Sequence, residues 1–369
     1  MINGHGGNIY EMARRLECLA SDIIDMSSNV NPLGPPSGLI ESIKKNIDSI
    51  TVLPEVDSRQ IIHGFAKFYN IDPKSVVAGN GTTSLIYSIP MALKTKKALI
   101  LGPTYADYAD SCIMYNVDYD YLMAQESNGF RHDIDMLRSR INRYDIVYIC
   151  NPNNPTGVLM SPDELEPVCR SFPDTCFIID ESYLPFTPDD GKTSMIHSGL
   201  SNVIILNSMS KVFRVPGLRI GFIVASDKII KKIDRFSLPW GVNSLAQVAV
   251  LYLMNNREHI KAFVDNTVEF IEAEKEKFLK IFENIPEIDF FKGAASFLLA
   301  RLNGKFTSDM VCEELAKERI LIRNCGNFKG LSDRHIRISL KTGEINRMAA
   351  ERLVNILQRS TKAICVPVK

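Results

Sequence analysis

The stretch VIILNSMSKVFRVPGLRIGFIV at residues 203–224 contains two apolar runs separated by a polar segment with glycine and proline. Each run is continuously apolar rather than alternating, which indicates a strand buried on both faces. Similar runs occur upstream, with helical segments such as Pro162–Ser171 between several of them. Strands that alternate with helices predict a largely parallel sheet in an α/β domain. The expected strands are 75–78, 97–101, 146–150, 176–179, 203–206 and 219–224.

The sequence pattern changes after about residue 245. Apolar residues at helical spacing over 264–282 predict a long helix. Further elements are expected at 297–302 (strand), 308–317 (helix), 320–323 (strand), 335–340 (strand) and about 344–358 (helix). We therefore expect a smaller α+β domain at 246–369 and a large ligand-binding domain at 37–245. Residues 1–36 would form an N-terminal arm that packs on the small domain.

The composition excludes several classes of protein. The chain has 369 residues, of which 45% are hydrophobic and 23% charged, as in a globular protein with a sizeable core. Its 43 acidic and 43 basic residues balance, so nothing indicates nucleic-acid or membrane binding. The N-terminus lacks the apolar region of a signal peptide, and the longest clean apolar run, 248–254, is too short to span a bilayer. Scattered cysteines and histidines indicate a cytoplasmic protein with neither a disulfide framework nor a bound metal.

Polar or glycine-rich clusters follow nearly every expected strand of the large domain. Ligands of open α/β sheets bind outside the carboxyl ends of the strands, so these clusters are expected to converge on one site. The clusters are Gly79–Thr83, Gly102–Tyr105, Asn151–Gly157, Asp180–Tyr183 and Asn207–Lys211.

The first cluster has the features of a phosphate site. Gly81 would let the backbone approach a ligand, and Thr82 and Thr83 open an apparent helix whose free N–H groups and dipole favour an anion. A lone G-x-G motif is weak evidence, so an ordinary tight turn is the alternative interpretation.

Lys211 follows an apolar strand and is flanked by Ser208 and Ser210, with Arg219 eight residues further on. A lysine at such a place is normally a solvated loop charge. A lysine that forms a Schiff base must instead be partly desolvated, so that its amine can be neutral and nucleophilic. The hydroxyls and the arginine beside it would then bind a dianionic phosphate.

Asp180 ends an apolar strand, where a carboxylate is costly without a partner. A cap or an ion pair would satisfy it, and so would a protonated pyridinium nitrogen, whose ring would then act as an electron sink. Tyr183 and Asn154 could reach the phenolic oxygen of such a ring, and Tyr105 could stack on it. Turn chemistry for Asn154 and a core-edge position for Tyr105 are the ordinary alternatives.

The motifs NPNNPTG (151–157), DESY (180–183) and SMSKxFxVPGLRIG (208–221), in this order and spacing, resemble the fold type I pyridoxal phosphate (PLP)-dependent aminotransferase superfamily. The similarity covers nearly the whole chain. It implies that Lys211 carries PLP as a Schiff base and acts in catalysis with Asp180 and Tyr105. The expected cofactor contacts are Gly81, Thr82, Thr83, Tyr105, Asn154, Asp180, Tyr183, Ser208, Ser210, Lys211 and Arg219.

Within this superfamily the chain is similar to histidinol-phosphate aminotransferases and, more closely, to threonine-phosphate decarboxylases of cobalamin biosynthesis. The second similarity rests on His5–Asn8, Ser28–Pro35, Pro239–Trp240 and Arg323–Phe328. It implies a small phosphorylated amino acid or amine as substrate. The residues implied to contact the substrate are His5, Gly6, Asn29, Asn154, Arg323 and Arg337.

Arg323 would take mainly the phosphate of this substrate and Arg337 mainly its carboxylate, because an arginine presents a planar fork to either group. The alternatives are a structural ion pair for each arginine and an N-terminal residue without a role for His5. The resemblance also implies a homodimer with active sites at the subunit interface. Leu53-Pro54 departs from the Tyr-Pro common in relatives, whose tyrosine reaches the partner's cofactor phosphate, so the resemblance does not supply that phosphate contact here.

The sequence leaves the reaction open. The bond that breaks at Cα is the one held perpendicular to the cofactor ring, and anion-binding residues select it by fixing the substrate's rotation. A sequence does not give that angle. The interpretation favoured by resemblance is decarboxylation of O-phospho-L-threonine to aminopropanol phosphate. The alternatives are a histidinol-phosphate aminotransferase that uses 2-oxoglutarate and a non-catalytic PLP-binding module.

Overall fold

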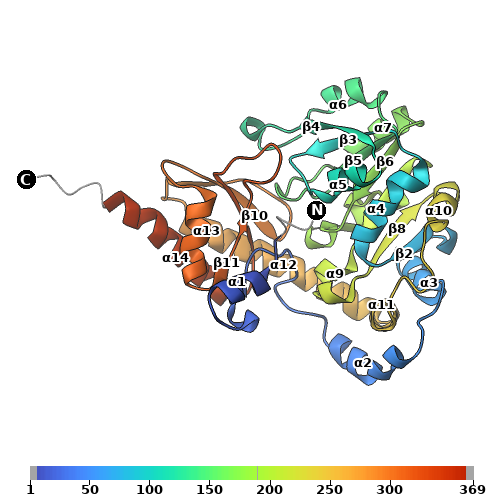
Figure 1. Ribbon diagram of the computed structural model, residues 1–369, viewed down its shortest axis with the longest axis horizontal. Coiled ribbons are helices and arrows are strands. Elements are labelled where there is room, and N and C mark those ends of the chain that lie inside the picture. The colour runs from blue at the N-terminus through green and yellow to red at the C-terminus, as the bar shows by residue number, and fades with distance from the viewer. Residues whose placement is uncertain (1–5, 189, 363–369) are drawn as a thin grey trace, which may run out of the picture.

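The computed structural model describes residues 6–188 and 190–362. Its larger sheet has seven strands in the order β2-β8-β7-β6-β5-β3-β4 (Figure 1). Only β8 runs antiparallel to its neighbours, so the carboxyl ends of the other six strands lie at one edge. The strands are β2 (Val76–Gly79), β3 (Lys97–Gly102), β4 (Asp118–Met123), β5 (Ile146–Cys150), β6 (Cys176–Asp180), β7 (Val203–Asn207) and β8 (Gly221–Ala225).

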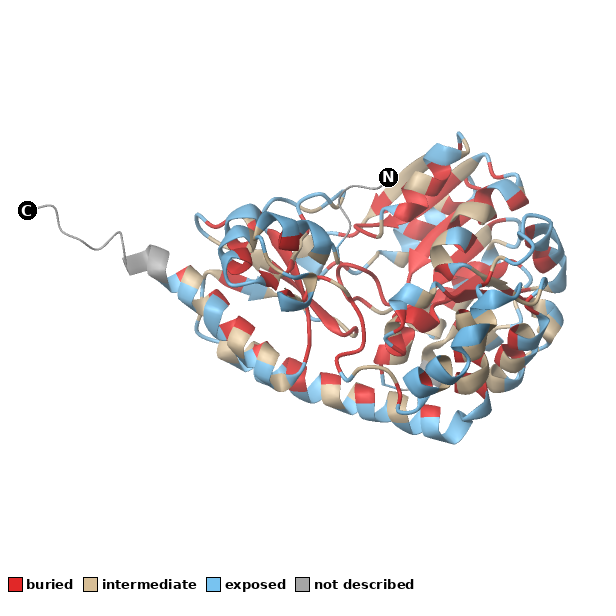
Figure 2. Cartoon of the chain, turned by 60° about the horizontal axis from the view of Figure 1, so that its bottom comes forward, coloured by how far each residue is buried: buried red, intermediate tan, exposed pale blue. Residues whose placement is uncertain are grey.

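The central strands are buried on both faces, as their continuous apolar runs predict. In β5, Val147 and Ile149 belong to one core cluster and Tyr148 to another, because successive side chains of a strand point to opposite faces. Figure 2 shows these buried strands between helices with exposed outer surfaces. The helices of this part are α2 (Leu39–Lys45), α3 (Arg59–Tyr69), α4 (Gly81–Leu93), α5 (Asp107–Met114), α6 (Ile134–Ile141), α7 (Pro162–Ser171), α8 (Asp190–Thr193), α9 (Met209–Val212), α10 (Asp227–Asp234) and α11 (Ser244–Asn255).

Two strand predictions differ from the structure. The strand expected at 219–224 begins only at Gly221, because Arg219 has a left-handed backbone (φ 54°) that a strand does not accommodate. The strand β4 was not predicted. It lies at the edge of the sheet and is only partly buried, so it lacks the apolar run that identifies the central strands.

The smaller part contains a four-stranded antiparallel sheet in the order β12-β13-β10-β9. The single strand expected at 320–323 is divided at Ile322: β11 pairs in parallel with β1, whereas β12 pairs with β13. These elements are β1 (Ile24–Asp25), β9 (Ile288–Phe290), β10 (Phe297–Leu302), β11 (Ile320–Leu321), β12 (Arg323–Asn324), β13 (His335–Ser339), α12 (Arg257–Ile281), α13 (Ser308–Lys317) and α14 (Gly343–Lys362).

The boundary expected between residues 245 and 246 falls inside α11. This helix packs against α2 and α3, so we propose that the large domain includes it and that the boundary lies within α12. The helix α1 (Ile9–Arg15) lies beside the smaller part, where Met12 and Ala13 share a cluster with Ala316 of α13 (Figure 1). Among the described helices, none is both long and apolar enough to cross a membrane.

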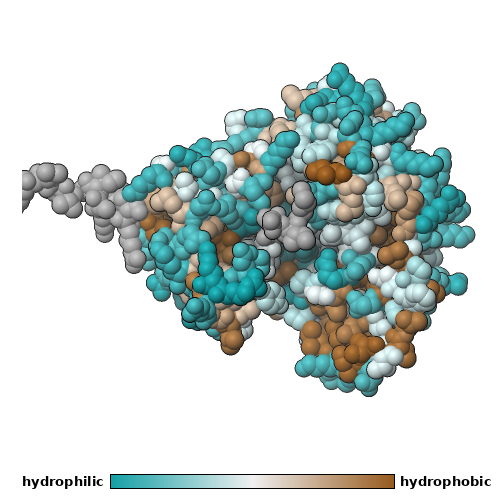
Figure 3. Space-filling view, in the orientation of Figure 1, coloured by the Kyte–Doolittle hydropathy of each residue, from teal (hydrophilic) through white to brown (hydrophobic). Residues whose placement is uncertain are grey.

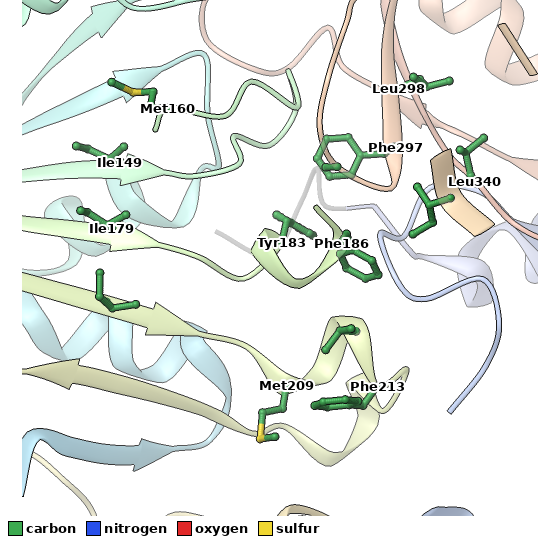
Figure 4. Packing of buried hydrophobic residues seen from close by; sticks show 14 of the residues in the cluster. Ile149, Met160, Ile179, Tyr183, Phe186, Met209, Phe213, Phe297, Leu298 and Leu340 are labelled. Carbon is green, nitrogen blue, oxygen red and sulfur yellow. The ribbon is translucent and has the colours of Figure 1, made fainter. Parts of the chain in front are cut away.

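The two parts share one continuous apolar cluster. Figure 4 shows Tyr183 and Phe186 of the larger part facing Phe297 of the smaller sheet. The rings of Tyr183 and Phe297 meet edge to face, with their centroids 5.3 Å apart. Tyr183 belongs to one of the polar clusters at the sheet edge, so this packing brings the smaller domain to the predicted site.

Candidate active site

Two adjoining cavities lie at the carboxyl edge of the larger sheet. The inner cavity has a volume of about 70 Å³ and the outer one about 460 Å³. They share Thr83, Tyr105, Asn154, Tyr183, Lys211 and Arg219. The structure brings all eleven predicted cofactor residues together, since each of them lines the inner cavity.

Lys211 lies in the short helix α9, directly after β7, and faces both cavities. Burial lowers the pKa of its ammonium group to about 8, and the nearby charge of Arg219 adds to this, while Asp180 opposes it. A substantial fraction of the amine is therefore neutral near physiological pH. This is the state that a nucleophilic lysine needs.

The carboxyl group of Asp180 is buried at the end of β6. Its Oδ1 accepts hydrogen bonds from the backbone N–H and the hydroxyl of Ser182, and its Oδ2 accepts one from Tyr108 at 2.8 Å. Burial nevertheless raises its pKa above the usual range. A cationic ring nitrogen at this point would compensate the desolvated charge.

The turn from β2 into α4 forms a cradle beside Arg219. Gly81 has φ +75°, and a Cβ built on it would lie 2.6 Å from Nη2 of Arg219. A Cβ on Gly221 would lie 2.6 Å from the backbone nitrogen of Thr82. Gly81 therefore lets Arg219 approach the turn, and Gly221 lets β8 pack against Thr82, so that backbone N–H groups lie beside a guanidinium, a combination that fits the phosphate of PLP.

Two of the predicted cofactor residues have other partners. The hydroxyl of Ser210 donates its one proton to the carbonyl of Ile220 and not to a ligand in the cavity. The side-chain oxygen of Asn154 accepts a hydrogen bond from Arg337. Asn154 thus joins the inner cavity to the predicted substrate residues.

The predicted substrate residues that the structure describes line the outer cavity: Gly6, Asn29, Asn154, Arg323 and Arg337. His5 lies outside the described residues. Asn29 donates to the hydroxyl of Tyr183 at 3.3 Å and accepts from Ser339, so it connects the two domains. Arg323 lies over the ring of Phe328, with 5.0 Å between the guanidinium carbon and the ring centroid.

Arg337 is a buried cation held by neutral oxygens. It donates to the side chain of Asn154 and to the carbonyl of Ser27 at 2.6 Å, and its Nε has no hydrogen-bond partner among the described residues. Burial lowers the pKa of its guanidinium, and within the described residues it forms no ion pair. Such a cation is suited to receive an anion from a ligand.

Two residues of the site, Tyr108 and Tyr121, were not predicted from the sequence. Tyr108, in the first turn of α5, lies three residues after Tyr105, and this spacing of two tyrosines was an available signal. Its ring stacks on Tyr148 at 5.0 Å and meets Tyr105 edge to face at 5.8 Å. Tyr121 lines the outer cavity from the unpredicted strand β4, where only the alternation of residues in DYDYLM indicated a strand.

The family described as aminotransferase class I and II matches residues 21–353. The chain belongs to the aminotransferase class I and II family. As a member of this family it is a PLP-dependent enzyme, a carboxy-lyase or an aminotransferase, with the fold type I architecture.

Two relatives of this chain are named for cobalamin biosynthesis or for the decarboxylation of threonine phosphate. The adenosylcobalamin biosynthesis bifunctional protein CobDQ of Leptospira interrogans is 32% identical over 95% of the chain, but the match spans only 41% of that longer protein. The threonine-phosphate decarboxylase of Salmonella typhimurium is 29% identical over 96% of the chain and 97% of its own length.

Solved structures of the family are similar over most of the chain. The histidinol-phosphate aminotransferase from Clostridium acetobutylicum has a TM-score of 0.84 and 28% identity. The L-threonine-O-3-phosphate decarboxylase from Porphyromonas gingivalis has a TM-score of 0.82 and 27% identity. Each match covers 91% of this chain and 100% of the solved chain. The fold therefore does not distinguish the two activities.

Proposed function

We propose that this enzyme decarboxylates O-phospho-L-threonine to aminopropanol phosphate. The observation that carries the proposal is the pair of arginines on the outer cavity, Arg323 and Arg337. A substrate with one phosphate and one carboxylate would engage both. The similarity to two proteins named as decarboxylases of threonine phosphate supports the same assignment.

The inner cavity would hold PLP. In this assignment Lys211 tethers the cofactor, Asp180 faces its ring nitrogen and Tyr105 covers its ring. Asn154 and Tyr183 would contact the ring oxygen, and the Gly81–Thr83 turn would bind the phosphate with Ser208 and Arg219. When bound, PLP supplies an electron sink for the electron pair left when a bond to Cα breaks.

The chain's own residues would then orient the substrate and move a proton. Arg337, fixed by its bonds to Asn154 and Ser27, holds the carboxylate, and Arg323 holds the phosphate. Two fixed anion contacts define the rotation of the substrate and thereby which bond breaks. The Nζ of Lys211, with a pKa of about 8, can hold or donate a proton near neutral pH.

A histidinol-phosphate aminotransferase remains the second candidate. The fold is equally compatible with it, since the TM-score to such an enzyme is 0.84 and the TM-score to the decarboxylase is 0.82. The outer cavity also has Tyr119 and Tyr121 at its border, and these aromatic rings could receive an imidazole.

The two candidates differ in a single assay. The enzyme with PLP is incubated with carboxyl-labelled O-phospho-L-threonine and no oxo acid, and release of labelled CO₂ is measured. We expect CO₂ release that depends on Lys211. Turnover of histidinol phosphate that requires 2-oxoglutarate, without CO₂ from phosphothreonine, would contradict the proposal. PLP binding with no turnover of either substrate would indicate a binding module.

We also propose that the enzyme is a homodimer. Large apolar side chains are exposed near α2 and the 236–240 turn, where Figure 3 shows a hydrophobic patch at the bottom of the molecule. Leu53 and Leu238 are 72% and 78% exposed, and the N–H of Trp240 donates to the carbonyl of Val56, so the two segments are adjacent. Such a patch marks a protein interface. Light scattering would give the mass, and a monomer would refute the assignment.

A further inference from the structure

The turn after β1 is organised by the carboxylate of Asp25. Its Oδ1 accepts the backbone N–H groups of Ser27 and Ser28 at 2.8 and 3.1 Å and the hydroxyl of Ser27 at 2.7 Å. Its Oδ2 accepts the hydroxyl of Ser28. Burial raises the pKa of Asp25, but the bonds from Ser28 and Ser27 outweigh burial and lower it overall. The turn is therefore built around an ionised carboxylate.

Ser27 connects this turn to both arginines. Its carbonyl accepts a hydrogen bond from Arg337 at 2.6 Å, and its hydroxyl accepts the N–H of Gly7 at 2.7 Å. A Cβ built on Gly6 would lie 2.9 Å from the carbonyl oxygen of Ser27 and 3.3 Å from Cδ of Arg323. Gly6 therefore lies between Ser27 and Arg323. Since Ser27 also contacts Arg337, its position affects the guanidinium groups of both arginines.

The turn is also clamped to the strand that carries Arg337. Alternate residues of a strand point to the same side, so Arg337 and Ser339 of β13 both reach the 25–29 segment, and Lys341, two residues beyond the strand, reaches it as well. The backbone N–H of Ser339 donates to the carbonyl of Met26 at 2.8 Å, and Lys341 donates to that of Ser28 at 3.1 Å. Burial lowers the pKa of the Lys341 ammonium group, and the negative charge of Asp25 acts against that shift.

We propose that Asp25 is a positioning residue for anion recognition: through Ser27 and the Gly6-Gly7 segment it holds Arg337 and Arg323 in register with each other. This inference rests on the proposed function, in which the two arginines bind the anionic groups of the substrate. Asp25 does not line the outer cavity, so its action is indirect.

The direction in which Asp25→Asn changes the affinity for an anion distinguishes a positioning role from a purely electrostatic one. Asp25 contributes a negative charge close to Arg337, and that charge alone disfavours a bound anion. If Asp25 acted only through its field, Asp25→Asn would tighten anion binding. If it positions the arginines, the same substitution weakens binding, because hydrogen bonds accepted by a neutral amide are weaker than those accepted by a carboxylate.

The test measures binding of inorganic phosphate to the PLP-loaded enzyme by calorimetry, with the cofactor phosphate site already filled. For Asp25→Asn we expect about a tenfold weaker affinity, comparable to the loss of one charge-assisted hydrogen bond. The KM for O-phospho-L-threonine should rise by a similar factor, while the visible absorption of the bound cofactor stays unchanged. Ser27→Ala, which removes the hydroxyl that links Asp25 to Gly7, should show a smaller loss.

Asp120→Asn is the matched control, since Asp120 also accepts a hydroxyl hydrogen bond and lies near a lysine, but its partners Tyr144 and Lys97 do not line the outer cavity. It should bind phosphate as the wild type does. Arg323→Met reports on the proposed function: if it leaves phosphate binding unchanged, the arginine assignment itself fails. If Arg323→Met weakens binding but Asp25→Asn does not, only the positioning role is overturned. Should Asp25→Asn not fold, unchanged binding by Ser27→Ala overturns it.

Discussion

The inner and outer cavities are built in different ways. The inner cavity is lined by residues that follow successive strands of a single sheet, such as Asp180 after β6 and Lys211 after β7. The outer cavity combines Gly6 of the N-terminal segment, Tyr121 of an edge strand and Arg337 of the smaller sheet. The first arrangement follows from strand topology within one domain, whereas the second depends on how separate parts of the chain pack.

Their electrostatics differ as well. In the inner cavity a carboxyl with a raised pKa and an amine with a lowered pKa lie close enough to influence each other. In the outer cavity the hydrogen-bond acceptors of Arg337, within the part of the chain that the structure describes, are both uncharged oxygens. The inner cavity can therefore receive a group that is cationic at one end and anionic at the other, and the outer cavity favours anions. Substitutions in the inner and in the outer cavity should therefore impair different properties of the enzyme.

The largest effect is expected for Lys211→Ala in the inner cavity. It removes both the tether and the proton carrier, so turnover should fall by more than about 10⁴-fold. The visible absorption of the bound cofactor should disappear while the protein stays folded by circular dichroism. Lys231→Ala, at an exposed lysine paired with Asp227, is the control and should keep both properties. A Lys211→Ala protein that retains the absorption would place the tether elsewhere.

Arg337→Met should mainly affect the outer cavity, although Arg337 also donates to Asn154, which lines both cavities. The loss of a charge-assisted contact to the substrate should lower kcat/KM by roughly 10²-fold, with the cofactor absorption preserved. The melting temperature should change little, because the loss of the hydrogen bonds to Asn154 and Ser27 is offset by removal of a buried cation that, among the described residues, has no carboxylate partner. Arg170→Met, at an exposed arginine of α7, should leave the kinetics unchanged. Normal kinetics in Arg337→Met would remove the distinction between the two cavities.

The smallest effect concerns pH and the inner cavity. Only the neutral amine of Lys211 can react, and its pKa is lowered to about 8. The rate at which the apoenzyme takes up PLP should therefore rise about tenfold per pH unit below pH 8 and level off above it. Stopped-flow absorbance would measure this rate. A rate that still rises steeply at pH 10 would show an unperturbed lysine.

The difference between the cavities also explains what could be predicted. Asp180 and Lys211 were identifiable because each follows an apolar run, and parallel strands bring their carboxyl ends to one edge. Tyr108 was missed although it donates to Asp180, because its contact depends on where α5 packs against the sheet. Arg337 was assigned by resemblance, since an arginine within a strand has no local feature that distinguishes a ligand contact from an ion pair.

The sequence by itself indicated the largely parallel sheet and, with the family resemblance, the residues that line the inner cavity, because these follow from local hydrophobic pattern and from the polar segments after successive strands. Only the tertiary structure decided that Asp25, Ser27 and Gly6 lie against Arg337 and Arg323, which are some 300 residues away in the chain. Contacts between such distant segments depend on the packing of one domain on the other, and no local pattern of residues encodes that packing.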